Sequence, residues 1–589
     1  MTGGVRRGMT EAWRGPGGTA SPKLKGTRVV SHIRGWIHEQ IDAVRDILRA
    51  ALRTMRRKGP DKVQFWFIAL LIGIGAGTAA TGFRSGIEAL ETALYGANDM
   101  SVASVAASLP WYWLLCVPIM GGLVVGVVLH LFTPDARVRS VADVIEGAAI
   151  RDGRVETRAG LASAFASLVT LSTGGSSGRE GPVVHLAAVI STWVSTRLHA
   201  DGITGRDLLG CAVAGAVSAS FNAPIAGALF ALEVVLRHFA VHAFAPIAIA
   251  AVAGTVINRL QYGGVTEFML PEPGALDFYV ELPAFLLLGA ICGLVAVAMM
   301  RLTFWSEDVA SQVVRRTRMP RWLRPAVSGA MLGVLAIGFP HIIGVGYETT
   351  AAALTGDLVF REAVVFAVLK CAAVAITFAG RMGGGIFSPS LMMGALTGLA
   401  FGIVATAVFP QVSGSETLYA LAGMGAVAAA VLGAPISTTM IVFELTGDWQ
   451  TGIAVMTAVS LSTALASQMV DRSFFLTQLV RRGIRLARGP QQYLLTITRV
   501  GSVMAGPLHP DYPGAQAAAA MQARGLSVDR SATLETAMPL FKNAETHFIA
   551  VTRRAGKAGP PELVGVLFEL EALRAYNRAL VATAEEEHS

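Results

Sequence analysis

The chain has 589 residues, of which 53% are hydrophobic and only 15% are charged. Soluble globular proteins carry about a quarter charged residues, so this composition excludes an ordinary soluble protein as well as a disordered or collagen-like one. The net charge of +8 is uneven, because residues 1–62 hold 14 Lys and Arg against 5 Asp and Glu. Basic segments at the ends of an apolar chain indicate contact with a lipid bilayer. No nucleic-acid partner is expected.

The basic segment 1–62 is expected to lie on the cytoplasmic side of the membrane. Between residues 32 and 55, apolar side chains recur at helical spacing opposite a charged face, which predicts a helix lying on the bilayer surface. Basic residues also follow the last apolar run, near Arg481. By the positive-inside rule we expect both termini to be cytoplasmic in a multi-pass protein of the cell (plasma or inner) membrane.

Residues 63–475 read as an all-α polytopic membrane domain. Apolar runs follow one another there, and many are short or interrupted by some of the 64 glycines, as in runs 208–233 and 417–446, each placed here as one segment. Short, glycine-broken runs are typical of discontinuous helices whose ends meet within the bilayer.

This domain contains an internal repeat. Asn222-Ala223-Pro224-Ile225 with Glu233 is echoed 211 residues later by Gly433-Ala434-Pro435-Ile436 with Glu444. A glycine-rich turn ending in proline precedes each copy, at Pro182 and at Pro389. We therefore expect two membrane repeats, 63–270 and 271–475, in inverted orientation. Glu233 and Glu444 end equivalent helices, which favours a structural pairing for both.

The strongest candidate site follows a Gly- and Ser-rich turn. Glu180 lies where this turn opens onto an apolar helix, and a helix start exposes free N–H groups that bind anions. A carboxylate there can occupy the anion site itself and leave it when protonated, which would make Glu180 a gate. The turn before Pro389 is uncharged and leads into a matching helix, so two helix starts would form an anion-selective constriction.

These motifs resemble signatures of the CLC family of voltage-gated chloride channels and proton/chloride exchangers. They are Gly178-Arg179-Glu180-Gly181-Pro182, Gly384-Gly385-Ile386-Phe387-Ser388-Pro389 and Phe221-Asn222-Ala223-Pro224. The resemblance implies a homodimer in which each subunit has its own anion pore, and a transport protein rather than an enzyme. It implies that Glu180 gates the pore and that backbone groups of two segments bind the anion, namely Gly178, Arg179 and Gly181, and Gly385, Ile386 and Phe387.

Three positions depart from the family pattern. In the family's first signature motif, which aligns with residues 139–143 here, only the serine is kept, as Ser140. Ser140 is therefore expected to be the hydroxyl ligand of the anion. Trp449 stands where the family's inner coordinating tyrosine is expected. Val234 occupies the position of the exchangers' inner proton-relay glutamate, and an aliphatic side chain cannot carry a proton. Val234 therefore favours passive, gated chloride conduction, with proton-coupled chloride exchange as the alternative.

Residues 490–589 form a separate, water-soluble segment. Alternating apolar runs and helical stretches predict a small α/β module. It resembles a degenerate CBS region, with an incomplete first copy at residues 500–504 and a fuller second copy from residue 531 to 568. That resemblance implies a possible adenine-nucleotide site, and no other cofactor is expected.

A remote alternative is an intramembrane serine protease. Gly175-Ser176-Ser177-Gly178 matches a GxSG motif, and His185 is the nearest candidate base. Nucleophilic catalysis would need this histidine within hydrogen-bond reach of Ser177. The four cysteines are isolated in apolar stretches, so neither a disulfide framework nor a metal site is expected.

Overall fold

The computed structural model describes residues 62–200, 202–239, 241–264, 278–411, 413, 415–484, 486, 495, 498–544, 546–554 and 561–588. The surface helix expected within residues 32–55 lies outside the described residues. Seven helices among the described residues are long and apolar enough to cross a bilayer, as expected for a polytopic membrane protein.

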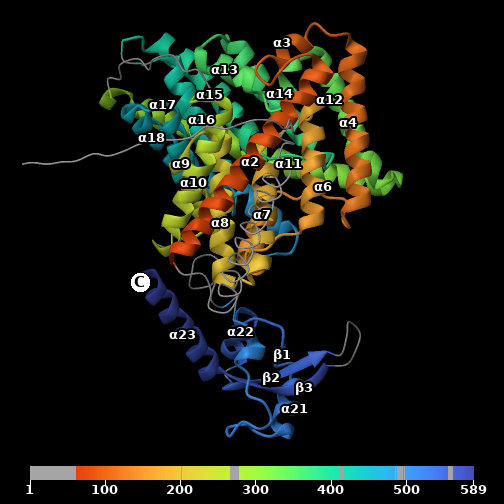
Figure 1. The fold of residues 1–589 in the computed structure, drawn as a ribbon, viewed down its shortest axis with the longest axis vertical. Coiled ribbons are helices and arrows are strands. Elements are labelled where there is room, and N and C mark those ends of the chain that lie inside the picture. The colour runs from red at the N-terminus through yellow and green to blue at the C-terminus, as the bar shows by residue number, and fades with distance from the viewer. Residues whose placement is uncertain are drawn as a thin grey trace, which may run out of the picture. The chain divides into compact units, whose positions relative to one another are not determined.

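The membrane part is built of helices throughout its described length (Figure 1). In chain order they are α2 (Lys62–Tyr95), α3 (Val102–Ala106), α4 (Trp111–Phe132), α5 (Val141–Ile150), α6 (Thr157–Ser172), α7 (Glu180–Leu198), α8 (Gly202–Phe221), α9 (Pro224–Phe230) with the π-helical turn η1 (Ala231–Leu236), α10 (Val241–Tyr262), α11 (Phe278–Thr317), the short turn η2 (Arg321–Leu323), α12 (Arg324–Gly338), the short turn η3 (Pro340–Ile342), α13 (Tyr347–Thr355), α14 (Phe360–Ala379), α15 (Phe387–Val408), α16 (Glu416–Leu432), α17 (Pro435–Thr446), α18 (Trp449–Met469) and α19 (Phe474–Arg481).

Two apolar runs that the sequence presents as single segments are each divided into two helices. Run 208–233 breaks between α8 and α9, and run 417–446 breaks between α16 and α17. Asn222 and Gly433, at the two breaks, adopt positive φ angles of 55° and 69°. Pro224 and Pro435 then start the next helix, because proline lacks an N–H and fits the first helical turn. The equivalent breaks agree with the internal repeat.

Close helix packing in this domain depends on small residues. A Cβ atom on Gly254 of α10 would lie 2.1 Å from the Gly215 carbonyl oxygen of α8, and one on Gly394 of α15 would lie 2.2 Å from the Gly423 carbonyl oxygen of α16. Each pair therefore lets two backbones approach more closely than larger side chains would allow.

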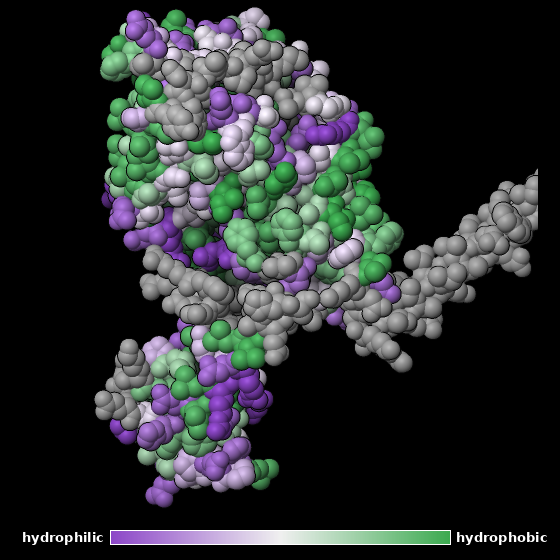
Figure 2. All heavy atoms as spheres, turned by 90° about the vertical axis from the view of Figure 1, so that its left-hand side faces the viewer, coloured by the Kyte–Doolittle hydropathy of each residue, from purple (hydrophilic) through white to green (hydrophobic). Residues whose placement is uncertain are grey.

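The outer surface of the helical domain is largely apolar. Figure 2 shows hydrophobic side chains across much of one face. Large apolar residues on several helices are well exposed, including Phe67 on α2, Leu260 on α10 and Val334 on α12. Water would not favour such extensive exposure, whereas the acyl chains of a bilayer solvate it.

The C-terminal segment folds as a small α/β module. Its sheet has the order β1-β2-β3, with β1 (Ser527–Asp529) parallel to β2 (Phe548–Arg554) and β2 antiparallel to β3 (Pro561–Phe568). Its helices are α21 (Ala515–Ala523), α22 (Leu534–Ala544) and α23 (Glu569–His588), and a short turn, η4 (Val500–Ser502), precedes them. The helices and strands expected in this segment are confirmed.

The two repeats stabilise each other through their glutamates. The Glu444 carboxylate of α17 accepts the first free N–H groups of α9, and the Glu233 carboxylate accepts those of α17. The distances are 3.0 and 2.8 Å from the N–H groups of Ile225 and Ala226 to Glu444, and 3.0 and 2.7 Å from those of Ile436 and Ser437 to Glu233. Each carboxylate thus has a structural role, as expected from its position in the repeat.

Replacing Glu444 with Ala should lower the free energy of unfolding by about 1–2 kcal/mol, because two N–H groups of α9 lose their acceptor. Thermal unfolding of the purified protein in detergent measures the change. Glu88→Ala is the control. It removes an i,i+4 ion pair with Arg84, worth roughly a few tenths of a kcal/mol, and a long 3.5 Å contact with the Tyr262 hydroxyl, and it uncaps no helix. Equal stability of the two variants would contradict this role for Glu444.

Candidate anion site

The two glycine-rich turns are joined into one unit. Gly178 and Gly385 exchange a pair of backbone hydrogen bonds, each 2.7 Å long. The Ser177 hydroxyl donates to the Gly383 carbonyl oxygen at 2.9 Å. Gly384 has a φ angle of 116°, and a Cβ there would lie 2.0 Å from the Ser177 oxygen. Only glycine fits this contact, so the turns of the two repeats are held face to face.

Neighbouring helices satisfy the irregular backbone of these buried turns. Hydroxyl oxygens of α6 and α14 accept their free N–H groups: Ser167 from Gly384 at 3.1 Å, Thr170 from Gly383 at 3.0 Å, and Thr377 from Ser176 at 3.1 Å. Non-helical backbone at membrane depth is stable only where protein or water supplies such partners. The small polar residues of α6 are therefore part of the site.

Both turns end at the start of a helix with the same local pattern. Helix α7 begins Glu180-Gly181-Pro182, and α15 begins Phe387-Ser388-Pro389. An α-helix leaves its first N–H groups without intrahelical acceptors, and its N-terminus carries about half a positive charge. The bridge between Gly178 and Gly385 brings these two N-termini together. Helix N-termini arranged in this way can bind an anion without a full cation.

The Glu180 carboxylate occupies the space between the two helix starts. Its Oε1 accepts hydrogen bonds from the Ser388 hydroxyl and, at 3.5 Å, from the Tyr347 hydroxyl. The backbone N–H of Ser388 also faces this carboxylate. Glu180 is only 3% exposed. The side chain therefore lies between the two helix starts, next to their free N–H groups.

The N–H groups of Gly178 and Gly385 are donated to each other's carbonyl oxygens, and the side chains of the other expected binding residues are packed within the protein. The Phe387 ring packs against Phe221 and Phe230, with centroids 4.8 and 6.0 Å apart. Ile386 is 1% exposed. The Arg179 guanidinium is also buried; it lies 4.8 Å over the Tyr347 ring and donates to the Ser220 carbonyl oxygen at 3.3 Å.

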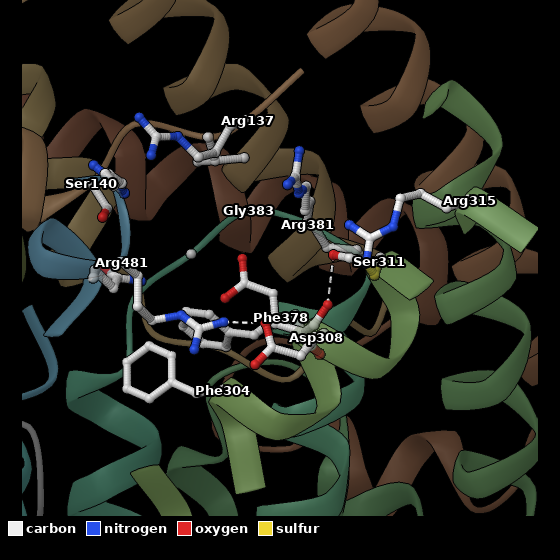
Figure 3. A pocket seen from close by; sticks show the side chains of 17 residues that line it. Arg137, Ser140, Phe304, Asp308, Ser311, Arg315, Phe378, Arg381, Gly383 and Arg481 are labelled. Carbon is white, nitrogen blue, oxygen red and sulfur yellow. Dashed lines mark hydrogen bonds and ion pairs between the residues drawn. The ribbon is translucent and has the colours of Figure 1, made fainter. Parts of the chain in front are cut away.

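A cavity of about 320 Å³ opens beside the turns and is lined by Ser140, Gly383 and Gly384 (Figure 3). Ser140 begins α5, and its N–H donates to the Asp143 carboxylate at 2.9 Å. Two acidic residues, Glu307 and Asp308, line the cavity together with five arginines, which are Arg137, Arg315, Arg381, Arg481 and Arg482. This excess of positive charge attracts anions toward Ser140 and the turns.

Trp449 does not lie in this cavity. It is 70% exposed at the start of α18, where its ring meets Phe443 edge-on at 6.0 Å. Asp448 caps α18 by accepting the Thr451 N–H at 2.7 Å, and the next side chain, the indole, is directed outward. Helix α19 packs against α5 instead and supplies Gln478 to the cavity. The expected anion ligand Trp449 therefore lies outside the cavity that Ser140 lines.

Val234 is buried in the π-helical turn η1, with 5% exposure. Its neighbour Glu233 accepts hydrogen bonds from the first N–H groups of α17.

The serine–histidine pair of a protease is absent from this part of the described chain. Ser177 donates to Gly383, and neither ring nitrogen of His185 has a hydrogen-bond partner among the described residues. The protease alternative therefore lacks its catalytic geometry.

Sequence reasoning missed two residues that hold Glu180. Ser388 stands inside a quoted motif, one residue before its proline, and this position was the available signal. Tyr347 follows Gly344-Val345-Gly346 at the start of α13 and carries no recognisable motif.

A protein-family model described as voltage gated chloride channel matches residues 121–467. The chain belongs to this family, the CLC family. A "putative chloride channel protein ClcB-like" of Ralstonia nicotianae is 32% identical over 397 residues, which span 66% of this chain and 91% of the relative. The "H(+)/Cl(-) exchange transporter ClcA" of Vibrio cholerae is 29% identical over 444 residues, which span 74% and 93% of the two chains.

Solved structures of CLC proteins share the fold. A slow cyanobacterial Cl⁻/H⁺ antiporter superposes with a TM-score of 0.63 at 20% identity and covers 71% of this chain and 97% of its own. A eukaryotic CLC transporter superposes with a TM-score of 0.62 at 18% identity and covers 88% and 98% of the two chains. This CLC protein is therefore an integral, multi-pass membrane protein.

Ser388→Ala should raise chloride efflux from liposomes by about tenfold near neutral pH, because a hydrogen bond to a buried carboxylate is worth roughly 1.5–3 kcal/mol. Ser390→Ala is the matched control, since Ser390 is buried on the same helix and donates only to the Phe387 carbonyl oxygen. An unchanged rate in Ser388→Ala would mean that this hydroxyl does not hold the closed position.

Arg315→Gln should lower chloride efflux several-fold at low ionic strength, and less at high salt, because the cavity loses one of its attracting charges. Arg316→Gln is the control, because Arg316 is adjacent in sequence but does not line the cavity. Equal rates for both variants across ionic strengths would contradict electrostatic attraction by the cavity.

Proposed function

We propose that this CLC protein is a proton-coupled chloride antiporter in which Glu180 carries the coupling. The observation behind the proposal is the position of the Glu180 carboxylate between the N-termini of α7 and α15. A carboxylate and a chloride ion need the same N–H groups, so each excludes the other. Protonation removes the charge that holds the carboxylate there, and this makes the site free for chloride.

The relatives support exchange more strongly than passive conduction. The Vibrio cholerae relative, named as an exchange transporter, aligns over 74% of this chain. Gated chloride conduction is the second candidate. It is favoured by Val234, because this buried aliphatic side chain leaves no proton carrier at the expected inner position. Exchange therefore requires a different inner route for the proton.

Chloride is proposed to enter through the arginine-lined cavity. Arg137, Arg315 and Arg381 would raise the local anion concentration, and the Ser140 hydroxyl would be the first ligand along the path. The backbone of Gly178, Gly181, Gly385, Ile386 and Phe387 would then surround the ion, with Glu180 as the gate.

The assembly is proposed to be a homodimer of subunits that each contain inverted repeats, 63–270 and 271–475. Apolar side chains on α9, α17 and α18 are exposed, including Ile225, Ile436 and Met456, and a second copy would cover them. We further propose that the protein resides in the cell membrane with both termini in the cytoplasm. The module 490–589 would be CBS-like and would bind an adenine nucleotide, with no other cofactor required.

Purified protein in liposomes tests coupling directly. A chloride gradient should drive uphill proton movement in the wild type, and Glu180→Ala should abolish the proton movement while chloride efflux continues, because the side chain that carries both proton and competing charge is gone. Chloride efflux and internal pH are recorded together. Ser390→Ala serves as a folded control. Chloride efflux with no proton movement in the wild type would instead establish passive conduction.

A further inference from the structure

Glu91, near the end of α2, is a buried carboxylate with an unusual environment. It is 1% exposed, and neither of its carboxylate oxygens accepts a hydrogen bond from an N–H or hydroxyl donor among the described residues. The carboxyl group of Asp99 faces it within hydrogen-bonding range. Two carboxyl groups in such contact form a hydrogen bond only if one of them carries a proton. The geometry therefore favours a shared proton.

Two cations lie around this acid pair. Arg179 Nη1 is 3.9 Å from Asp99 Oδ2. Lys370 is fully buried, and its Nζ donates to the carbonyl oxygens of Ile342 and Gly344 at 3.3 and 3.0 Å. A Cβ on Gly344 would lie 3.3 Å from Glu91 Oε1. The segment 342–344, whose carbonyl oxygens accept from Lys370, therefore lies next to the acid pair.

The remaining polar groups near Glu91 are on its own helix. Glu88 lies one turn earlier, paired with Arg84 at 2.9 Å, and Tyr95 lies one turn later. Glu88 is also 3.5 Å from the Tyr262 hydroxyl of α10. The basic side chains that face the acid pair from other segments, among the described residues, are therefore Arg179 and Lys370.

A proton shared by the pair also avoids two like charges side by side in a buried site. Two ionised carboxylates in contact without water repel each other, so one of them holds its proton.

The acid pair is connected to the gate. Arg179 lies over the Tyr347 ring, and the Tyr347 hydroxyl is 3.5 Å from Glu180. Arg179 also precedes Glu180 in the chain, so the charge on the pair acts on the gate through Arg179. Glu91 is 29 residues beyond the start of α2, about 44 Å at the rise of a helix, which exceeds the roughly 30 Å of a bilayer core.

We propose that Glu91 and Asp99 share a proton and form a proton-binding site on the outer side of the transporter, where their charge sets the release of Glu180 through Arg179. The outer placement rests on the proposed function and its cytoplasmic termini. Asp99, with a side chain 9% exposed, connects the pair to the solvent. Glu91 and Asp99 are thus positioning residues for the gate.

Infrared difference spectroscopy on the purified full-length protein detects the shared proton without any transport. The wild type should show the carbonyl band of a buried protonated carboxylic acid that changes with pH, and Glu91→Gln should lose it. Glu88→Gln, on the same helix, should keep it. A band that persists in Glu91→Gln would overturn the proposal, whether or not the protein transports chloride.

Chloride efflux against external pH tests the connection to the gate. In Glu91→Gln/Asp99→Asn, the negative charge of the pair is removed from beside Arg179. Arg179 then favours ionised Glu180 more strongly, so the midpoint should move to more acidic pH by about one unit. Glu91→Gln alone keeps the negative charge on Asp99 and should move it less. Continued efflux at acidic pH shows that the variants are folded. If the double variant had the same midpoint pH of chloride efflux as Glu88→Gln, the link between the acid pair and Glu180 would be overturned.

Discussion

The structure depends on one constraint: two irregular turns lie at membrane depth, and every backbone group in them needs a partner. The hydrogen bonds between Gly178 and Gly385 and the hydroxyl groups of α6 and α14 provide these partners. Because the turns are satisfied this way, the N–H groups at the starts of α7 and α15 remain available for an anion. The demand for backbone satisfaction and the anion site therefore have the same structural origin.

The internal repeat divides this arrangement between two halves that cap each other's helices. Each half ends one helix with a glutamate that satisfies the start of a helix in the other half, at Glu233 and Glu444. Each half also contributes one of the two turns. The charged side chain between the turns is Glu180 of the first half, and the Ser388 hydroxyl of the second half donates a hydrogen bond to it. The two helix starts have a similar backbone but different side chains, and this difference places the proposed gate, Glu180, in the first half only.

Much of the site follows from local sequence, because glycine-rich turns, prolines and a charged residue in an apolar run have few structural solutions. The position of Glu180 at a helix start and the pairing of the two turns could be predicted for this reason, as could the structural roles of Glu233 and Glu444. Trp449, expected from the sequence as an anion ligand, is exposed outside the cavity, because its position depends on how α18 packs and not on local sequence. Tyr347 and Lys370 depend on contacts between distant helices, which no spacing rule reveals, whereas Ser388 lies inside a motif whose position could have indicated it.

The central claim is that chloride and the Glu180 carboxylate compete for one site. Crystals of Glu180→Gln and of the wild type, both grown in bromide, test it through anomalous scattering from the ion. The account predicts a bromide peak between the N-termini of α7 and α15 in Glu180→Gln, within reach of the Ser388 N–H, and none at that position in the wild type. Bromide at this position in both proteins, or in neither, would contradict competition.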